Sequence, residues 1–200
     1  VNRGYNTIAL VRSIEKIKSE EGQKLYGDSY DGSKLVEMDV SDAKALSDFM
    51  STVDIPIDTV VSCLASRSGI KEDAYAVDYQ ASLNVLEAAR CNKAIHFCLL
   101  SAFCVQKPEL QFQHAKLKLE AEIREQAGIA YSIVRPTAYF KSVAGQFENI
   151  KSGKPIVLFG DGKSASCNPI AESDLAEFML DCVPVESQRH NTTLIIGGTG

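Results

Sequence analysis

The sequence predicts a doubly wound α/β fold built on a parallel sheet. Two observations support this fold class. Short apolar runs alternate with longer amphipathic runs through residues 1–136. The apolar runs carry few polar residues, which is typical of parallel strands covered by helices on both faces. Beyond residue 136 the elements become shorter. We therefore expect a core over 1–136 and a smaller C-terminal region over 137–200 that is interleaved with it.

Five strands are expected in the core, each a short run rich in Val, Ile, Leu or Phe. They are Thr7–Val11, Lys34–Val40, Asp58–Leu64, His96–Ser101 and Tyr131–Arg135. Three of the segments between them have the apolar spacing of amphipathic helices. We predict helices from an N-cap at Ser41 to about Thr52, over 73–92, and from about Phe112 to Gln126.

The C-terminal region is expected to hold two further strands and one helix. The strands are Pro155–Phe159 and Thr192–Ile196, and residues 160–162 are expected to form a turn after the first of them. Ser173 is expected to cap a helix that runs to about Cys182. No internal repeat or low-complexity tract interrupts this order.

Bulk composition limits the classes of function. The chain has 200 residues and a formal net charge of -5, so we expect no nucleic-acid partner. No apolar run approaches the roughly 18 residues that a membrane-spanning helix needs, and we predict no transmembrane segment. The N-terminal residues have the features of neither a signal peptide nor a transit peptide. The six cysteines form no Cys-x-x-Cys pair, so we predict buried free thiols and no bound metal ion.

In a doubly wound sheet, ligands bind where the parallel strands end. The residues that follow the predicted strands should therefore converge on one crevice, which is the candidate site. They are Arg12, Ser13, Asp39, Val40, Cys63, Leu64, Ala65, Ser66, Ser101, Phe103, Pro136, Thr137, Ala138 and Tyr139.

Two features bear on a nucleotide ligand. A dinucleotide fold usually begins with a strand, a glycine-rich loop and a helix, whose backbone amides meet the pyrophosphate. No such element precedes Arg12, so we expect the first strand and its glycine loop to lie before Val1. Gly197–Gly200 has the glycine-rich composition of such a loop, but no helix follows it, and we interpret it as a turn. Arg12 stands where an acidic residue would select NAD, and it suits the 2′-phosphate of NADPH; the alternative is a solvated surface arginine.

Four segments carry a resemblance to a known family. They are residues 60–71 (VVSCLASRSGIK), 99–122 (LLSAFCVQKPELQFQHAKLKLEAE), 131–146 (YSIVRPTAYFKSVAGQ) and 153–176 (GKPIVLFGDGKSASCNPIAESDLA). With them the chain resembles the divinyl chlorophyllide 8-vinyl reductases, an atypical branch of the extended short-chain dehydrogenase/reductase family that is related to NmrA-like proteins. The resemblance implies a Rossmann-like fold and NADPH as cofactor. It also implies reduction of the 8-vinyl group of divinyl chlorophyllide or protochlorophyllide a, a magnesium tetrapyrrole, to ethyl.

The resemblance also assigns roles to residues. Ser101 and Lys116 stand at the family's serine and lysine positions and are expected to be catalytic, with Lys116 holding the nicotinamide ribose. The position of the usual proton-donating tyrosine is Phe112, and that of the helix asparagine is Asp78. Reducing a conjugated vinyl group needs no acid beside an alkoxide, because hydride arrives at carbon and charge spreads into the macrocycle. The residues expected to contact the pigment are Phe103, Cys104, Phe112, Tyr139 and Phe140. The other strand-end residues and Lys116 are expected to bind the cofactor.

Two other classes of protein share this fold. A non-catalytic scaffold, such as an accessory subunit of a photosynthetic or respiratory complex, would keep the fold for docking. An NmrA-like sensor would bind NADPH without turnover. The resemblance favours the enzyme and implies a chloroplast location, in the stroma or at the thylakoid periphery, where it could associate with photosynthetic complexes. An intact glycine loop upstream would distinguish the enzyme from the scaffold.

Overall fold

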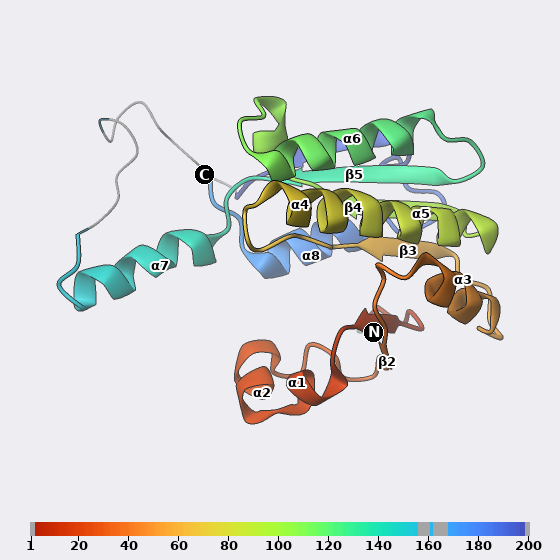
Figure 1. Cartoon of the computed structure of the whole chain (residues 1–200), viewed down its shortest axis with the longest axis horizontal. Helices are drawn as coiled ribbons and strands as arrows, with labels where there is room; N and C mark the ends of the chain where they lie inside the picture. Colours follow the sequence, from red (N-terminus) through yellow and green to blue (C-terminus); the bar gives the residue numbers. More distant parts are fainter. Residues whose placement is uncertain (1–2, 156–160, 162–167, 199–200) are drawn as a thin grey trace.

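The structure is a computed structural model, and it describes residues 3–155, 161 and 168–198. In that part of the chain, six strands form two parallel sheets (Figure 1). They are β1 (Ile8–Val11), β2 (Lys34–Glu37), β3 (Thr59–Ser62), β4 (His96–Leu100), β5 (Ala130–Pro136) and β6 (Thr192–Ile196). The first two strands pair with each other, and the last four pair in the order β3-β4-β5-β6.

Helices connect these strands. They are α1 (Ile14–Lys18), α2 (Glu20–Tyr26), α3 (Ala43–Ser51), α4 (Lys71–Ala74), η1 (Tyr75–Ala81), α5 (Ser82–Cys91), η2 (Phe103–Gln106), α6 (Gln111–Glu125), α7 (Phe140–Lys151) and α8 (Glu172–Leu180). The helix predicted over 73–92 corresponds to the continuous run α4-η1-α5, in which η1 is a π-helix. The short element η2 is a 3₁₀-helix.

The sheet order fits the predicted fold class. Every neighbouring pair of strands is parallel. In the usual doubly wound order 3-2-1-4-5-6, one strand separates an outer pair from the remaining strands. Here β2-β1 and β3-β4-β5-β6 match those two parts, and β1 does not pair with β3 among the described residues. In Figure 1 the β1-β2 pair lies below the larger sheet with α1 and α2.

Helices cover the larger sheet on both faces, as the apolar strands predict. Neighbouring residues of a strand point to opposite faces. On β4, Phe97 packs into the same cluster as α3, α5 and α6, whereas Cys98 packs with α8. On β5, Ile133 and Val134 divide in the same way. The C-terminal region also belongs to this sheet, because β6 pairs with β5.

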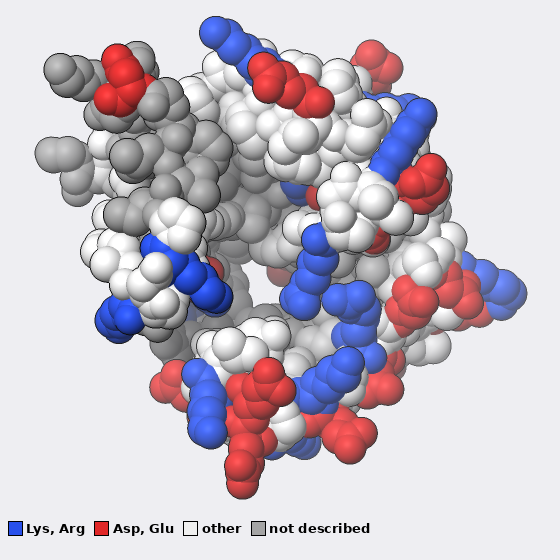
Figure 2. All heavy atoms as spheres, turned by 60° about the vertical axis from the view of Figure 1, so that its left-hand side comes forward, with Lys and Arg blue, Asp and Glu red and all other residues white. Residues whose placement is uncertain are grey.

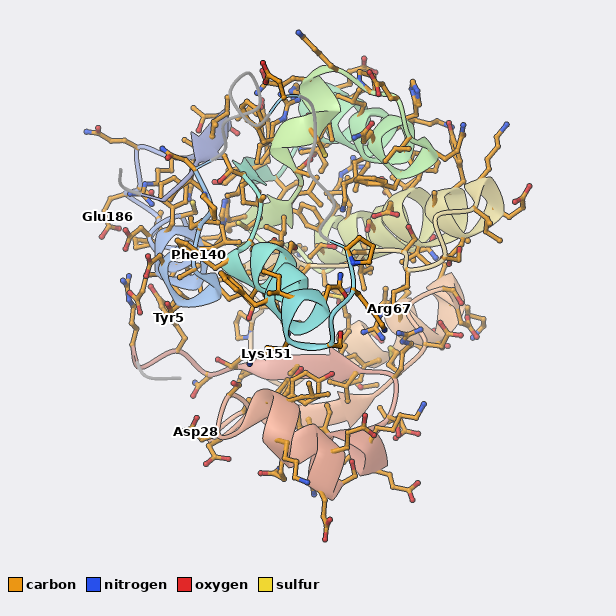
Figure 3. The ribbon with its side chains drawn as sticks, turned by 90° about the vertical axis from the view of Figure 1, so that its left-hand side faces the viewer. Tyr5, Asp28, Arg67, Phe140, Lys151 and Glu186 are labelled. Carbon is orange, nitrogen blue, oxygen red and sulfur yellow. The ribbon has the colours of Figure 1, made fainter. Side chains whose placement is uncertain are left out.

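Besides the short 3₁₀-helix η2, three α-helices in the described residues were not expected from the sequence. The short helices α1 and α2 each bury a single residue, Ile17 and Gly22, so they leave no apolar periodicity to detect. On α7, Phe140, Phe147 and Ile150 are exposed, so its apolar residues do not mark a buried face. Figure 3 views the molecule from the side on which α7 projects.

Two predicted helix caps are wrong. The N-cap of α3 is Asp42, whose side chain accepts from the Ala45 amide at 2.9 Å. Ser41 lies one residue earlier and donates its hydroxyl to Asp39 instead. The N-cap of α8 is Ala171, and Ser173 lies within the first turn. Both predictions placed a cap at a serine beside the true boundary, which is the usual error of sequence-based helix ends.

Two elements predicted in the C-terminal region lie mostly outside the residues that the structure describes. The strand predicted over 155–159 and the turn over 160–162 lie outside the described residues except at Pro155 and Asp161. After β6, Gly198 lies so close to the chain that a Cβ there would be 2.2 Å from the Pro169 carbonyl oxygen. Close packing against the chain therefore explains why residue 198 is glycine, without any role in binding phosphate. Within the described ranges, none of the helices is both long enough and apolar enough to cross a bilayer.

The cysteines only partly follow their prediction. In the described part of the chain, Cys98 and Cys182 are buried and free, whereas Cys63, Cys91 and Cys104 are free but exposed. Each exposed cysteine lies at or beyond the end of a strand or helix, where the apolar pattern no longer buries its side chain. In the same residues, no cluster of His, Cys, Asp or Glu has the geometry to hold a metal ion.

Candidate functional site

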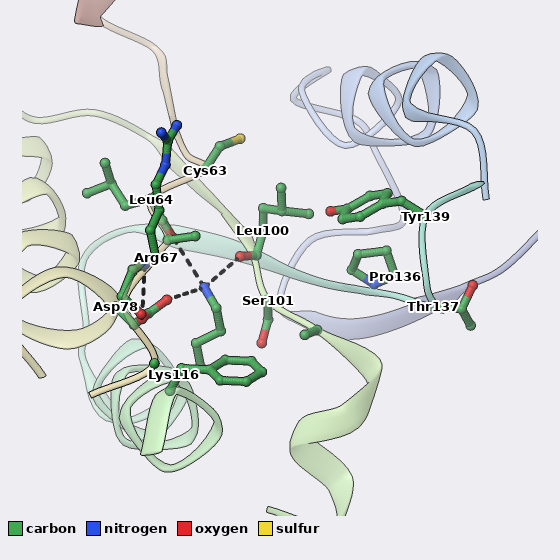
Figure 4. A pocket seen from close by; sticks show the side chains of 15 residues that line it. Cys63, Leu64, Arg67, Asp78, Leu100, Ser101, Lys116, Pro136, Thr137 and Tyr139 are labelled. Carbon is green, nitrogen blue, oxygen red and sulfur yellow. Dashed lines mark hydrogen bonds and ion pairs between the residues drawn. The ribbon is translucent and has the colours of Figure 1, made fainter. Parts of the chain in front are cut away.

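A cavity of about 350 Å³ lies at the carboxyl ends of β3, β4 and β5 (Figure 4). This is the edge at which doubly wound folds bind their ligands. The lining residues are Cys63, Leu64, Ala65, Ser66, Arg67, Gly69, Asp78, Leu100, Ser101, Ala102, Phe112, Lys116, Pro136, Thr137 and Tyr139. Figure 2 shows a hollow on this side of the molecule with several Lys and Arg side chains around it.

The structure brings together most of the residues predicted to form one site. Those that line the cavity are Cys63, Leu64, Ala65, Ser66, Ser101, Phe112, Lys116, Pro136, Thr137 and Tyr139. Those that do not line it are Arg12, Ser13, Asp39, Val40, Phe103, Cys104, Ala138 and Phe140. The first group comes from β3, β4, β5 and α6, so the larger sheet with its covering helix builds this site.

The candidate site residues at the ends of β1 and β2 do not line the cavity and make other contacts. Ser13 caps α1 by accepting a backbone hydrogen bond from its first turn. Hydrogen bonds from Ser41 lower the pKa of Asp39, and the charge of Arg12 adds to that effect. Val40 packs against the main core. Arg12 is exposed at the carboxyl end of β1, where it remains available to an anion.

Three aromatic or thiol residues expected beside the pigment lie outside the cavity. Phe103 and Cys104 are on η2, which buries Val105 and leaves these two residues exposed. Phe140 begins α7 and is 56% exposed. The backbone of Ala138 is used differently, since its carbonyl accepts from the Ile170 amide at 2.9 Å.

Lys116 lies inside the protein, at the junction of two strand ends and a helix. Its side chain is only 7% exposed. The ammonium donates to the carbonyl oxygens of Leu64 at 3.2 Å and Leu100 at 3.4 Å. Its nitrogen is also 3.1 Å from Oδ1 of Asp78, which completes a buried ion pair. An ammonium has three donors; two of them have backbone acceptors here, and the contact with Asp78 is an ion pair in which Oδ1 makes no hydrogen bond to a described residue.

The π-helix η1 carries the partner of Lys116. A single π-turn inside an α-helix shifts the following residues and is frequent at functional sites. Asp78 lies in this turn, and its side chain is 1% exposed. Its other oxygen, Oδ2, accepts from the Ser66 hydroxyl at 2.5 Å and from the Ser66 amide at 3.2 Å. Asp78 therefore joins the loop after β3 to the lysine on α6.

Ser101 is connected to a buried carboxylate. Its hydroxyl donates to Glu120 at 2.6 Å, and Glu120 is completely buried. Arg135 and Arg124 form ion pairs with the same carboxylate. Although burial alone would raise the pKa of Glu120, the hydrogen bonds from Arg135 and Ser101 hold it below its usual value. Glu120 is therefore ionised at neutral pH and can only accept the proton of Ser101.

Arg67 is a cavity residue that sequence reasoning missed. The loop that carries it is held by Asp73, whose Oδ2 accepts from the amides of Arg67 at 3.2 Å and Ser68 at 3.0 Å. Its guanidinium has no ion-pair partner among the described residues. In Figure 4 it points away from the pair formed by Lys116 and Asp78. Nothing in the sequence pattern distinguishes it from other exposed arginines.

Glu120 was also missed, although the sequence holds a signal for it. Phe112, Lys116 and Glu120 follow one another at intervals of four residues, so they share one face of α6. The first two of them line the cavity. A carboxylate next on that face, together with Arg135 at the end of an apolar strand, predicts a buried ion pair.

The comparisons with known proteins agree with this geometry. The profile of the NAD(P)H-binding family matches residues 1–185. A chloroplast divinyl chlorophyllide a 8-vinyl-reductase of Cucumis sativus is 50% identical over 204 residues, which cover 100% of this chain and 48% of that protein. The protein of the same name from Arabidopsis thaliana is 45% identical over 205 residues, which cover 100% of this chain and 49% of that protein. The chain thus spans about half the length of these relatives, and the resemblance found in the sequence is confirmed.

Among solved structures, UDP-glucuronic acid 4-epimerase of Bacillus cereus in complex with NAD has a TM-score of 0.79. The match covers 100% of this chain and 71% of that one at 15% identity. At this low identity the likeness establishes the Rossmann-like fold alone. The profile of the NAD(P)H-binding family establishes more than the fold, because it matches residues 1–185, which include all the residues that line the cavity. The chain therefore belongs to the NAD(P)H-binding family.

Proposed function

We propose that this protein uses NADPH to reduce the 8-vinyl group of divinyl chlorophyllide or protochlorophyllide a to an ethyl group, in the biosynthesis of chlorophyll. The similarity to 8-vinyl-reductases over the whole chain supports this substrate class. Their designation as chloroplastic supports a chloroplast location, and we place the protein in the stroma or at the thylakoid periphery.

One observation carries the choice of reaction. The two positions that would serve a carbonyl substrate with protons cannot do so, because Phe112 has no acidic proton and Ser101 gives its proton to Glu120. Carbonyl reduction develops charge on oxygen and needs such donors. Reduction of a conjugated vinyl group develops charge that the tetrapyrrole itself delocalises. These two positions therefore favour a carbon–carbon double bond, whose proton must come from another group or from water.

The cavity residues fit the nicotinamide end of the cofactor. NADPH supplies a hydride when it is bound. In Figure 4, Leu64 and Thr137 lie on opposite sides of the cavity, and Lys116 lies between them near the strand ends. In the complex, Lys116 would exchange a carbonyl partner for the ribose hydroxyls. Arg12 would hold the 2′-phosphate. The guanidinium of Arg67, which has no ion-pair partner among the described residues, suits the propionate carboxylate of a chlorophyllide.

The test is an assay of the full-length protein with divinyl chlorophyllide a and NADPH deuterated at C4 of the nicotinamide. We expect an ethyl product that carries deuterium. In the same assay, Phe112→Tyr should retain activity within about tenfold, the cost of placing a hydroxyl in an apolar wall. A large gain of activity in Phe112→Tyr would show that an acid is needed at this position and would overturn the mechanism.

A docking scaffold is the second candidate, and one observation favours it. Lys116 already donates to two backbone carbonyls and pairs with the buried carboxylate of Asp78, so the lysine serves the fold without any cofactor. NADPH binding to the full-length protein without turnover of any divinyl pigment would support the scaffold or a sensor. Turnover would exclude both.

A further inference from the structure

Four hydroxyl groups line the cavity, and three of them donate a hydrogen bond to a group of the protein. Ser66 donates to Asp78 at 2.5 Å, and Ser101 donates to Glu120 at 2.6 Å. The hydroxyl of Thr137 donates to the carbonyl oxygen of Asn168. A hydroxyl has one proton to donate. These three side chains therefore offer lone pairs to a ligand but no proton.

Tyr139 is different. Its hydroxyl has no hydrogen-bond acceptor in the part of the chain that the structure describes, although the ring lines the cavity. Figure 4 shows it across the cavity from Lys116, with the hydroxyl end of the ring directed toward Leu100. Burial raises the pKa of Tyr139 above its ordinary value of 10. The phenol therefore carries its proton at neutral pH.

The backbone fixes the position of Tyr139. Tyr139 forms a parallel bridge with Ile170. The Ile170 amide donates to the carbonyl of Ala138 at 2.9 Å, and its carbonyl accepts from the amide of Phe140 at 3.2 Å. Ile170 itself is buried, with 1% of its surface exposed. A side chain anchored on both sides in this way can present its hydroxyl in one direction, as a proton donor requires.

We propose that Tyr139 is the general acid of the reaction, which protonates the carbon next to the one that receives hydride. This inference rests on the proposed vinyl reduction. As the hydride forms a new C–H bond at one vinyl carbon, the π bond breaks and its electron pair moves into the conjugated system. The phenol O–H bond of Tyr139 then breaks, and its proton forms the second C–H bond. The phenolate regains a proton from water, so the sum is NADPH and one proton for each double bond.

Apart from the Arg67 guanidinium, which is too weak an acid to give up a proton, one other protonated group in the described cavity lining lacks an acceptor. Cys63 lies just beyond β3, and no hydrogen bond from its thiol is present among the described residues. In Figure 4 its sulfur points away from Lys116, whereas the hydroxyl of Tyr139 points across the cavity. The geometry therefore favours the phenol, and Cys63→Ala serves as the matched variant for the competing assignment.

The first experiment compares Tyr139→Phe and Cys63→Ala in the full-length protein. Because the hydroxyl of Tyr139 has no partner among the described residues, its removal leaves none of them unsatisfied, and Tyr139→Phe should fold normally. We expect kcat to fall about a hundredfold or more, in the range typical of a general acid. The affinities for NADPH and for divinyl chlorophyllide a, measured by fluorescence, should stay within about threefold. Cys63→Ala should lose far less turnover than Tyr139→Phe. The control for unchanged turnover is Cys91→Ala, at the end of α5 and outside the cavity lining.

The second experiment separates an acid from a residue that only shapes the cavity. Replacing Tyr139 with 3,5-difluorotyrosine lowers the pKa of the phenol while the ring is kept. If Tyr139 is the acid, the decline of kcat at alkaline pH should begin at lower pH in this protein than in the wild type. Tyr139→Phe should show no such decline in its residual activity.

The inference and the proposed function fail in different ways. If the wild type is active and Tyr139→Phe is equally active, Tyr139 is not the general acid. The same holds if Cys63→Ala is inactive and Tyr139→Phe is active. Either result leaves the proposed vinyl reduction intact. An unshifted alkaline decline in the fluorinated protein also overturns the acid. If the wild type reduces no divinyl pigment, the proposed function itself fails, and the acid proposal fails with it.

Discussion

The hydroxyl of Ser101 donates to the buried carboxylate of Glu120 across 2.6 Å. Glu120 is also paired with Arg135 and Arg124, which keep it ionised. The serine at the end of β4 is therefore oriented toward the protein, and it presents only lone pairs to the cavity. This relationship changes what is expected of Ser101 as a catalytic residue.

Ser101→Ala should be a mild substitution. We expect kcat to fall by less than about tenfold, whereas loss of a hydroxyl that stabilises a transition state costs about a hundredfold or more. Unfolding in urea should show a loss of about 1–2 kcal/mol, because Glu120 loses one hydrogen bond. The matched control is Ser62→Ala, since the buried hydroxyl of Ser62 has no hydrogen-bond partner within the part of the chain that the structure describes. A loss of a hundredfold in Ser101→Ala, with both ligands still bound, would contradict this reading.

Lys116 should show a structural role and a catalytic role that can be separated. Lys116→Met leaves the buried carboxylate of Asp78 without its cation, and we expect a loss of about 3–5 kcal/mol in unfolding free energy. Adding Asp78→Asn removes the unpaired charge and should restore part of that stability. Turnover should stay at least about a hundredfold below wild type in both variants, because the group that we propose to hold the nicotinamide ribose is missing. A stable double variant with full activity would support the scaffold instead.

Arg12 should determine the preference for NADPH. The side chain is exposed at the end of β1, so its removal should not disturb the core. Arg12→Ala in the full-length protein should weaken NADPH more than NADH by about 1.5–3 kcal/mol, the range for a charged hydrogen bond. Lys24→Ala, which removes one exposed charge on α2, is the control. Equal weakening of both nucleotides would contradict the assignment to the 2′-phosphate.

The sequence predicted the fold class and the edge of the sheet that holds the cavity, because both follow from short-range pattern. Strand residues such as Phe97 and Ile133 are apolar since both faces of the sheet are covered, and this is visible in the sequence. The order of strands then places Ser101 and Thr137 at one edge. No long-range information is needed for either step.

The sequence could not predict which polar groups pair inside the site. The partners of Lys116 depend on the π-turn that carries Asp78, and such a turn leaves no periodic signal. Phe103 and Cys104 follow a strand, as cavity residues do, but the chain turns there to bury Val105. The orientation of a loop is decided by packing against distant residues, which a local pattern does not contain.

The exposed cysteines offer a direct test of the cavity. Denatured protein should react with about six equivalents of a thiol reagent without prior reduction, because every described cysteine is free. In the native protein, NADPH or pigment should slow the labelling of Cys63, which lines the cavity, and should leave Cys91 unchanged as an internal control. Peptide mass spectrometry measures both rates. Equal labelling of Cys63 with and without ligands would show that they bind elsewhere.

The last prediction concerns a buried histidine at the opposite end of the sheet. His96 is 0% exposed, and its Nε2 lies 2.9 Å from the hydroxyl of Ser132. Since Ser132 donates to the carbonyl of Arg189, Nε2 of His96 must be the donor in their contact. Nδ1 therefore carries no proton, and it has no hydrogen-bond partner in the described ranges. Burial, with a smaller effect from the stacked ring of His190, lowers the pKa of His96 to about 4.

The pH dependence of stability follows from this pKa. His96 takes up a proton near pH 6.5 in the unfolded chain but only near pH 4 in the folded chain. The contribution of His96 to the free energy of unfolding is therefore complete above pH 6.5 and is lost as the pH falls from 6.5 toward 4. Between pH 6.5 and 5 the loss should be about 2 kcal/mol. Glu120 adds little there, because its contribution is lost only below its ordinary value of 4.5. Urea unfolding at several pH values should show the loss in wild type and in His114→Gln, whose histidine is exposed on α6, but much less of it in His96→Gln. The same slope in His96→Gln would show that another group controls acid stability.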